Sequence, residues 1–238
     1  MAIAVARRTD NPKEFVKGFA KTLWLGDVHP LVKGYKCLLK AGHTVQPELY
    51  DTKTVVFLFS HGTGYVAGKN KAHNVDGVSV YIPDFKKENY SIYAATDMEF
   101  MMVLVDMLDS DLRGFADTHI LLPYFKRVED AMEYTQSCKG PNTRSWSMIP
   151  NGMCARVLAG IVKADGEGTT EKGHPSVDQW NYTLPGSDFT LTVEDEQIQH
   201  SEGEWSFVPA GLDHSLVSQP GKTVYYVWFE LKTKELEN

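Results

Sequence analysis

Two histidines and one glutamine in the last third of the chain carry side chains that could coordinate a transition metal. His174 is followed five residues later by Gln179, and His214 follows a Pro-Ala-Gly turn. Imidazole nitrogens with an oxygen donor suit divalent manganese, iron, nickel or zinc. We predict a metal site made of His174, Gln179 and His214. The alternatives are that the histidines are structural and that Gln179 is a substrate-binding amide.

The donor set also indicates a kind of chemistry. A neutral amide oxygen such as that of Gln179 is a weaker donor than a carboxylate, so the ion would keep more positive charge. An ion of this kind acts as a Lewis acid on an anionic substrate. Open coordination positions would accept a carboxylate, hydroxy-acid or enediol group.

The residues around these donors alternate as they do in β-strands, where every second side chain faces the same way. Lys172 and His174 therefore share a face of one strand, and Gln179 and Asn181 share a face of the next. We favour an inward Lys172 as the catalytic residue, which would bind a substrate carboxylate or transfer a proton. An outward Lys172 would have no role in the site.

Three further residues are candidates for contact with substrate. Asn181 and Trp228 could line the pocket, and Arg156 lies on a predicted entry strand. An inward arginine can clamp a carboxylate through two hydrogen bonds. The outward orientation is the commoner one for an arginine on a strand.

The spacing of glycine, proline and histidine in this region resembles the cupin family. The second cupin motif, G-x5-P-x-G-x2-H-x3-N, is matched by Gly203, Pro209, Gly211 and His214, with Ser218 in the place of the asparagine. This resemblance covers residues 150–232 and implies a small β-barrel with a metal site inside.

The first cupin motif, G-x5-H-x-H-x3,4-E-x6-G, is matched only in part. His174 takes the place of its second histidine and Gly186 that of its last glycine. Lys172 stands where the family has its first histidine, and Gln179 stands where it has glutamate. The departure at two ligand positions favours a modified site.

A weaker copy of the same pattern of motif residues lies about 124 residues earlier in the chain, with Gly62 in the place of Gly186. Gly77 and Pro83 then take the places of Gly203 and Pro209, and no histidine falls at a ligand place. An internal repeat of this length indicates two similar domains. We predict a mostly β protein with two tandem cupin barrels (double-stranded β-helix, jelly roll) and a few short helices.

The predicted domains follow from this repeat. An N-terminal helical segment covers residues 1–27, with Asn11 as N-cap and Pro12 at the first helical position. Residues 28–107 form a degenerate first barrel, and residues 108–145 form a linker with a short helix over 126–136. Residues 146–238 form the second barrel, which carries the site.

Composition excludes several classes of function. The net charge of −7 argues against nonspecific nucleic-acid binding. Three widely spaced cysteines suit a reducing compartment, and no signal peptide or long apolar run occurs, which predicts a cytoplasmic protein with no membrane partner. No phosphate-binding loop is present, so we expect no nucleotide. The resemblance to cupins implies no organic cofactor.

The resemblance implies a metal-dependent bicupin enzyme acting on a small carboxylate-bearing metabolite, and a homodimer. The chain is distantly similar to ureidoglycine aminohydrolase and glyoxylate-pathway proteins. Cupins include hydrolases, isomerases, lyases and dioxygenases, so the fold does not name the reaction. A non-catalytic small-molecule-binding cupin and a structural, storage-like bicupin are the alternatives.

Overall fold

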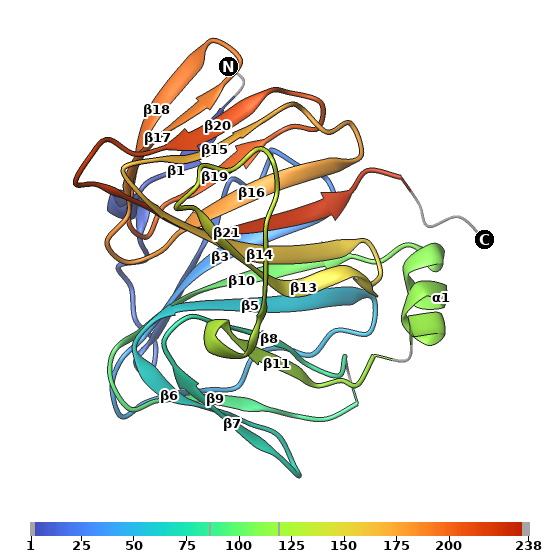
Figure 1. Cartoon of the computed structure of the whole chain (residues 1–238). Helices are drawn as coiled ribbons and strands as arrows, with labels where there is room; N and C mark the ends of the chain where they lie inside the picture. The colour runs from blue at the N-terminus through green and yellow to red at the C-terminus, as the bar shows by residue number, and fades with distance from the viewer. Residues whose placement is uncertain (1–2, 86, 119, 235–238) are drawn as a thin grey trace. The chain divides into compact units, whose positions relative to one another are not determined.

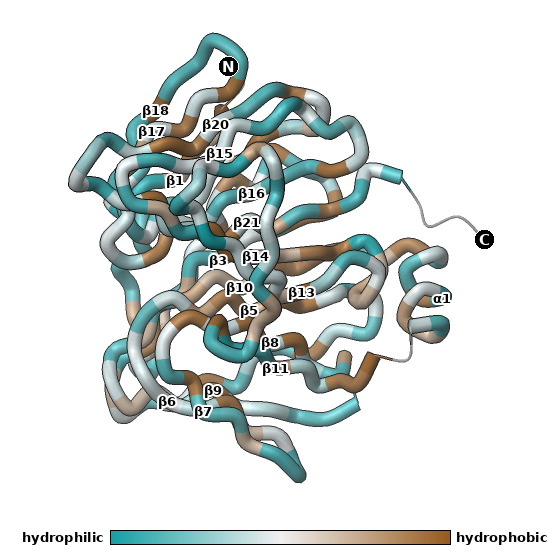
Figure 2. The backbone as a smooth tube through the Cα atoms, in the orientation of Figure 1, coloured by the Kyte–Doolittle hydropathy of each residue, from teal (hydrophilic) through white to brown (hydrophobic). Residues whose placement is uncertain are grey.

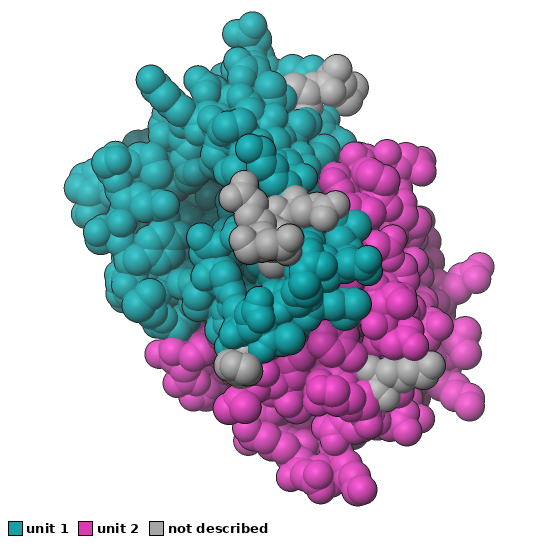
Figure 3. Space-filling model, turned by 90° about the vertical axis from the view of Figure 1, so that its right-hand side faces the viewer, with its two compact units in different colours: residues 1–8, 108–119, 131–238 teal, residues 9–107, 120–130 magenta. Residues whose placement is uncertain are grey.

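The computed structural model describes residues 3–85, 87–118 and 120–234, and antiparallel β-sheets dominate this part of the chain (Figure 1). The mostly β prediction is confirmed. The chain divides into two compact units (Figure 3). Unit 1 takes its described residues from 1–8, 108–119 and 131–238, and unit 2 takes its own from 9–107 and 120–130. None of the described helices is long and apolar enough to cross a membrane.

Unit 2 consists of two sheets with strand orders β11-β8-β5-β10-β3-β2 and β4-β9-β6-β7. Its strands are β2 (Phe19–Trp24), β3 (Val32–Leu39), β4 (Thr44–Val45), β5 (Lys53–His61), β6 (Thr63–Ala67), β7 (Ala72–Asp76), β8 (Ser79–Ile82), β9 (Ser91–Ala94), β10 (Met98–Asp106) and β11 (Tyr124–Arg127). Hydrophobic stretches concentrate in central strands such as β5 and β10 (Figure 2). The core is rich in aromatic rings that contact one another, among them Phe57, Phe59, Tyr81 and Phe100.

Unit 1 also consists of two sheets, with strand orders β1-β19-β16-β21-β14-β13-β12 and β15-β20-β17-β18. Its elements are β1 (Ala4–Ala6), α1 (Asp109–Thr118), β12 (Met132–Tyr134), β13 (Arg144–Cys154), β14 (Val157–Asp165), β15 (Gly168–Glu171), β16 (Val177–Thr183), β17 (Asp188–Val193), β18 (Glu196–Ser201), β19 (Trp205–Val208), β20 (His214–Val217) and β21 (Thr223–Lys232). Strand β17 shows why these sequences form sheets. Phe189, Leu191 and Val193 alternate along it and are buried in the core of the unit.

The predicted N-terminal helix is wrong. Residues 19–24 form strand β2, which pairs with β3 along its whole length, and a short 3₁₀ helix, η1 (Arg8–Asp10), precedes it. Lys17 and Gly18 both have positive φ, a conformation that interrupts a right-handed helix. Phe15 and Leu23, two apolar residues of the predicted helical segment, are 39% and 45% exposed. Pairing within the sheet therefore overrides the local helix signals.

The predicted helix over residues 126–136 is wrong as well. These residues include the end of β11, the 3₁₀ helix η2 (Val128–Asp130) and strand β12. The α-helix of this region is α1, where the carboxylate of Asp111 accepts a hydrogen bond from the Leu108 amide. Strand β11 extends the main sheet of unit 2 beside β8, and β12 extends that of unit 1 beside β13. The segment thus supplies edge strands to both units.

The start of the chain contributes a strand to unit 1. Ala4, Val5 and Ala6 of β1 pair with residues 205–207 of β19. Arg7 follows directly and forms an ion pair of 2.7 Å with the largely buried carboxylate of Glu204. Strand β1 is therefore an edge of the seven-stranded sheet.

Candidate metal centre

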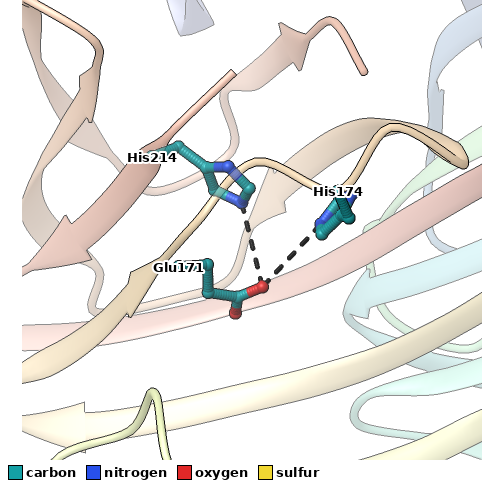
Figure 4. Close-up of side chains that lie close together, drawn as sticks. All are labelled: Glu171, His174 and His214. Atoms are coloured by element: carbon teal, nitrogen blue, oxygen red, sulfur yellow. Dashed lines mark ion pairs between the residues drawn. The ribbon is translucent and has the colours of Figure 1, made fainter. Parts of the chain in front are cut away.

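Strands β15 and β20 of unit 1 position two potential ligands opposite each other. Glu171 is the last residue of β15, His214 is the first of β20, and the two are register partners. Directly opposed residues of an antiparallel pair project from the same face. His174 follows in the loop after β15, where the Gly211 amide donates a hydrogen bond to the His174 carbonyl and the Gly173 amide donates one to Asp213. Figure 4 shows the three side chains converging.

Their donor atoms are close enough for one ion. The Oε2 atom of Glu171 lies 3.8 Å from Nε2 of His174 and 4.0 Å from Nε2 of His214. One ligand atom from each residue lies within 4.8 Å of the others. Ligands that bind a transition ion at about 2.1 Å stand at most about 4.2 Å apart. Small side-chain adjustments would therefore bring all three onto a single ion.

The hydrogen bonding of the two histidines fits a metal site. The Nδ1–H group of His214 donates to the Leu212 carbonyl at 3.1 Å, which leaves the lone pair of Nε2 facing Glu171. That Nε2 and both ring nitrogens of His174 are buried without a hydrogen-bond partner in the described chain. Buried polar atoms normally have partners, and a backbone carbonyl commonly fixes the tautomer of a metal-binding histidine. The donor set accommodates a divalent transition ion.

The predicted ligand Gln179 lies beside this cluster. It is buried on β16 and lines the same cavity as His174. Its amide nitrogen donates to the side-chain oxygen of Asn181 at 2.8 Å. Coordination by Gln179 stays a prediction. Asn181 does not line the cavity and instead accepts the hydrogen bond from Gln179.

Glu171, and not the predicted Lys172, lies in the cluster with the two histidines. Thr169 and Glu171 share the inward face of β15, because alternate residues of a strand face the same way. Lys172 comes after the strand end, is exposed and does not line the cavity, so its predicted inward orientation is wrong. The cupin motif assumes a spacing of two residues between its first two ligands, whereas Glu171 and His174 are three apart. Sequence reasoning missed Glu171 for that reason.

The other two predicted contacts have different outcomes. Trp228 lines the cavity. The prediction for Arg156 is wrong, because its guanidinium is buried in a two-point ion pair with Asp111 of α1, with N–O distances of 2.8 Å. Arg156 also donates to the carbonyl of Lys232. It fixes α1 to the sheet of unit 1 and does not reach the cavity.

A cavity of about 780 Å³ borders the cluster within unit 1, with Glu171 and His174 in its lining. This volume suits a small organic molecule. The lining residues whose polar or aromatic groups could contact a ligand include Tyr134, Lys139, Glu171, His174, Gln179, Trp228 and Glu230.

Glu230 brings a second carboxylate to the cluster. It is the register partner of Gln179, and its Oε1 lies 3.9 Å from Nε2 of His174. Burial raises the pKa of Glu230 to about 7; the negative charge of Glu171 adds to this rise and Lys139 opposes it. A carboxyl with such a pKa can give or take a proton near neutral pH. The alternation that predicted Trp228 also places Glu230, two residues later, on the same face.

Lys139 and Tyr134 come from residues 131–145, which the sequence presented as a linker. Burial lowers the pKa of the Lys139 amine, while the charges of Glu171, Cys138 and Glu230 raise it. Burial raises the pKa of Tyr134, whose phenol has a side-chain hydrogen bond with Trp228. No local motif marks either residue, because contacts across the sheets bring them to the cavity.

No model of a known protein family matches the sequence, and no curated protein matches it significantly. Solved structures match the whole fold. A Pseudomonas aeruginosa protein described as glyoxylate-induced superposes with a TM-score of 0.78 at 11% identity, covering 100% of this chain and 90% of its own. A Bacillus subtilis oxalate decarboxylase superposes with a TM-score of 0.73 at 10% identity, covering 98% of this chain and 78% of its own. The Lactobacillus farciminis oxalate decarboxylase in its formate complex superposes with a TM-score of 0.68 at 12% identity, covering 98% of this chain and 87% of its own.

These proteins have the cupin fold, and each unit of this chain consists of two antiparallel sheets. At identities of 10–12% the likeness concerns the fold alone. The chain is therefore a protein of cupin fold with a candidate His–His–Glu metal centre in unit 1.

Proposed function

We propose that the protein is a metal-dependent enzyme that acts on a small carboxylate-bearing metabolite. The observation that carries the proposal is the set of three imidazole nitrogens of His174 and His214 that have no hydrogen-bond partner among the described residues. Two of them lie 3.8 and 4.0 Å from the carboxylate of Glu171. The likeness to oxalate decarboxylases, whose substrate is a small acid, supports the same substrate class.

The residues have separate roles in this proposal. Glu171, His174 and His214 would hold a divalent manganese, iron, nickel or zinc ion, with Gln179 as a further oxygen donor. Such an ion supplies a Lewis acid that polarises a bound carboxylate or carbonyl group. The Leu212 carbonyl keeps the His214 ring in the tautomer that presents Nε2 to the cluster.

Glu230 is positioned to move a proton. Its carboxyl is buried beside His174, and burial raises its pKa in the metal-free protein, which favours a carboxyl that can exchange a proton with substrate. Trp228 and Tyr134 line the cavity and help to exclude bulk water from it. Hydrolysis, isomerisation, lyase chemistry and dioxygenation are all compatible with this arrangement. No organic cofactor is part of the proposal, and the homodimer and cytoplasmic location stay predictions.

Elemental analysis of protein purified without chelator tests the proposal. We expect nearly one equivalent of a transition metal in the wild type and less than about a tenth in His214→Ala and Glu171→Gln. Thermal unfolding without metal would show that both variants are folded. Loaded wild type would then be screened for turnover of small hydroxy-, keto- and ureido-acids.

Two results would contradict the proposal. Folded wild type that binds none of the four metals when they are supplied would remove the metal centre. A loaded protein that binds small acids and converts none of them would favour a non-catalytic binding protein.

A further inference from the structure

Residues 138–140 form an extra strip of β-structure along the free side of β15. Lys139 makes a β-bridge with Thr169, the Gly140 amide donates to the Gly168 carbonyl at 3.0 Å, and the Thr170 amide donates to the Cys138 carbonyl at 2.9 Å. Opposed residues of an antiparallel pair share a face. Lys139 therefore projects from the same face as the fully buried Thr169.

That face is also the face of Glu171, two residues after Thr169 on β15. The backbone thus directs Lys139 into the cavity that holds the metal ligands, and its side chain lines that cavity together with Glu171 and His174. A flexible side chain on a loop would not be aimed in this way. The position is built by two backbone hydrogen bonds, one on each side of Lys139, that together form the bridge to Thr169.

The ammonium group of Lys139 is held by neutral partners. It donates a hydrogen bond of 2.6 Å to the buried hydroxyl of Ser145 and lies 4.2 Å from the ring centroid of Tyr134. No carboxylate among the described residues forms an ion pair with it. A lysine ammonium has three N–H donors, and the Ser145 bond uses one. Burial lowers its pKa, and the charges of Glu171 and Glu230, which line the same cavity, oppose this shift.

We propose that Lys139 forms an anion subsite of the same cavity, and that the substrate is an acid with two anionic groups joined by an uncharged spacer. This inference rests on the proposed function, since one anionic end binds at the Glu171–His174–His214 cluster. The other end accepts a charge-assisted hydrogen bond from Lys139. Tyr134 and Trp228 contact the spacer, and about 780 Å³ accommodates an acid larger than oxalate.

Calorimetric titrations of metal-loaded protein with three dicarboxylates test the subsite. Succinate, glutarate and adipate would each be compared with the monoacid of equal length, namely butyrate, valerate and hexanoate. We expect at least one diacid to bind about tenfold or more tightly than its monoacid. In Lys139→Met this preference disappears through a loss of about 10- to 100-fold in diacid affinity. Monoacid affinity and metal content stay unchanged.

Two controls accompany Lys139→Met. Lys139→Arg keeps the charge and should retain most of the diacid preference. Lys163→Met removes an exposed lysine of β14 outside the cavity, and it should behave as the wild type does. Diacid affinity that is equal in Lys139→Met and wild type would overturn the subsite, and so would a wild type that binds each diacid no better than its monoacid.

Failure of the metal centre and failure of the subsite give different results. If wild type carries no metal, the proposed function fails, and the same titrations on metal-free protein still test Lys139. A diacid affinity that depends on Lys139 in that protein supports the subsite. Metal-free protein that binds no diacid, or binds it independently of Lys139, overturns it.

Discussion

The buried carboxyl of Glu230 makes the stability of the metal-free protein depend on pH in an unusual direction. Its pKa rises from an ordinary 4.5 to about 7 because it is buried and lies near the charge of Glu171. The folded protein therefore binds this proton more tightly than the unfolded chain does. Stability is fully present below pH 4.5 and is lost as pH rises toward and through about 7.

The size of this loss follows from the pKa rise. Each pKa unit corresponds to about 1.36 kcal/mol, so the rise from 4.5 to about 7 amounts to about 3 kcal/mol. Glu230→Gln removes the ionisable group and nearly preserves its shape. The unfolding free energy of the variant, relative to wild type, should increase by about 3 kcal/mol between about pH 4 and about pH 8.

Urea unfolding in the presence of a chelator, followed by tryptophan fluorescence, measures this difference. Unit 1 contains four of the five tryptophans, namely Trp146, Trp180, Trp205 and Trp228, so the signal reports mainly on the unit that holds Glu230. Glu129→Gln, an exposed carboxyl in unit 2, makes the same chemical change outside the cavity and should leave the pH profile unchanged. Parallel profiles for wild type and Glu230→Gln would refute the reasoning, because they would mean that Glu230 titrates equally in both states.

Three other variants test features of unit 1. Arg156→Met leaves the buried carboxylate of Asp111 unpaired and should lower the free energy of unfolding by about 3–5 kcal/mol in urea titrations, whereas a cost below about 1 kcal/mol would contradict the buried pair. Lys172→Ala should keep metal content and turnover within about twofold of wild type, because the side chain is exposed. A tenfold loss of metal content or turnover would show that Lys172 acts in the site. Gly168→Ala would place a Cβ 1.8 Å from the Leu216 carbonyl oxygen, so it should separate β15 from β20 and at least halve the metal content by elemental analysis. Full metal content in that variant would show that the strands tolerate the change.

The motif glycines explain why the cupin frame was visible in the sequence. Gly186, Gly203 and Gly211 all have positive φ, a conformation that favours glycine and fixes the turns between consecutive strands. With these turns in place, His214 falls at the start of β20, where the motif predicts it. Local turn chemistry was therefore sufficient to predict the β-architecture and to bring His174 and His214 together.

Residues positioned by contacts distant in sequence could not be predicted in the same way. Glu171 depends on where β15 ends, and Lys139 depends on a bridge to a strand thirty residues away. Arg156 looked like a substrate clamp because nothing local reveals its partner Asp111, which lies 45 residues earlier. The N-terminal helix failed for a related reason, since pairing of β2 with β3 outweighs the capping signals around Asn11.

The pairing of β1 with β19 has a consequence for folding during synthesis. About two hundred residues separate these partners, and such distant contacts form slowly. Residues 9–107 of unit 2 leave the ribosome early, whereas β1 stays without its partner strand until β19 has been synthesised. A peptide tag or deletion at the very start of the chain would thus affect the unit with the metal ligands, and the Arg7–Glu204 ion pair would be lost with it. Tags placed for purification should take this dependence into account.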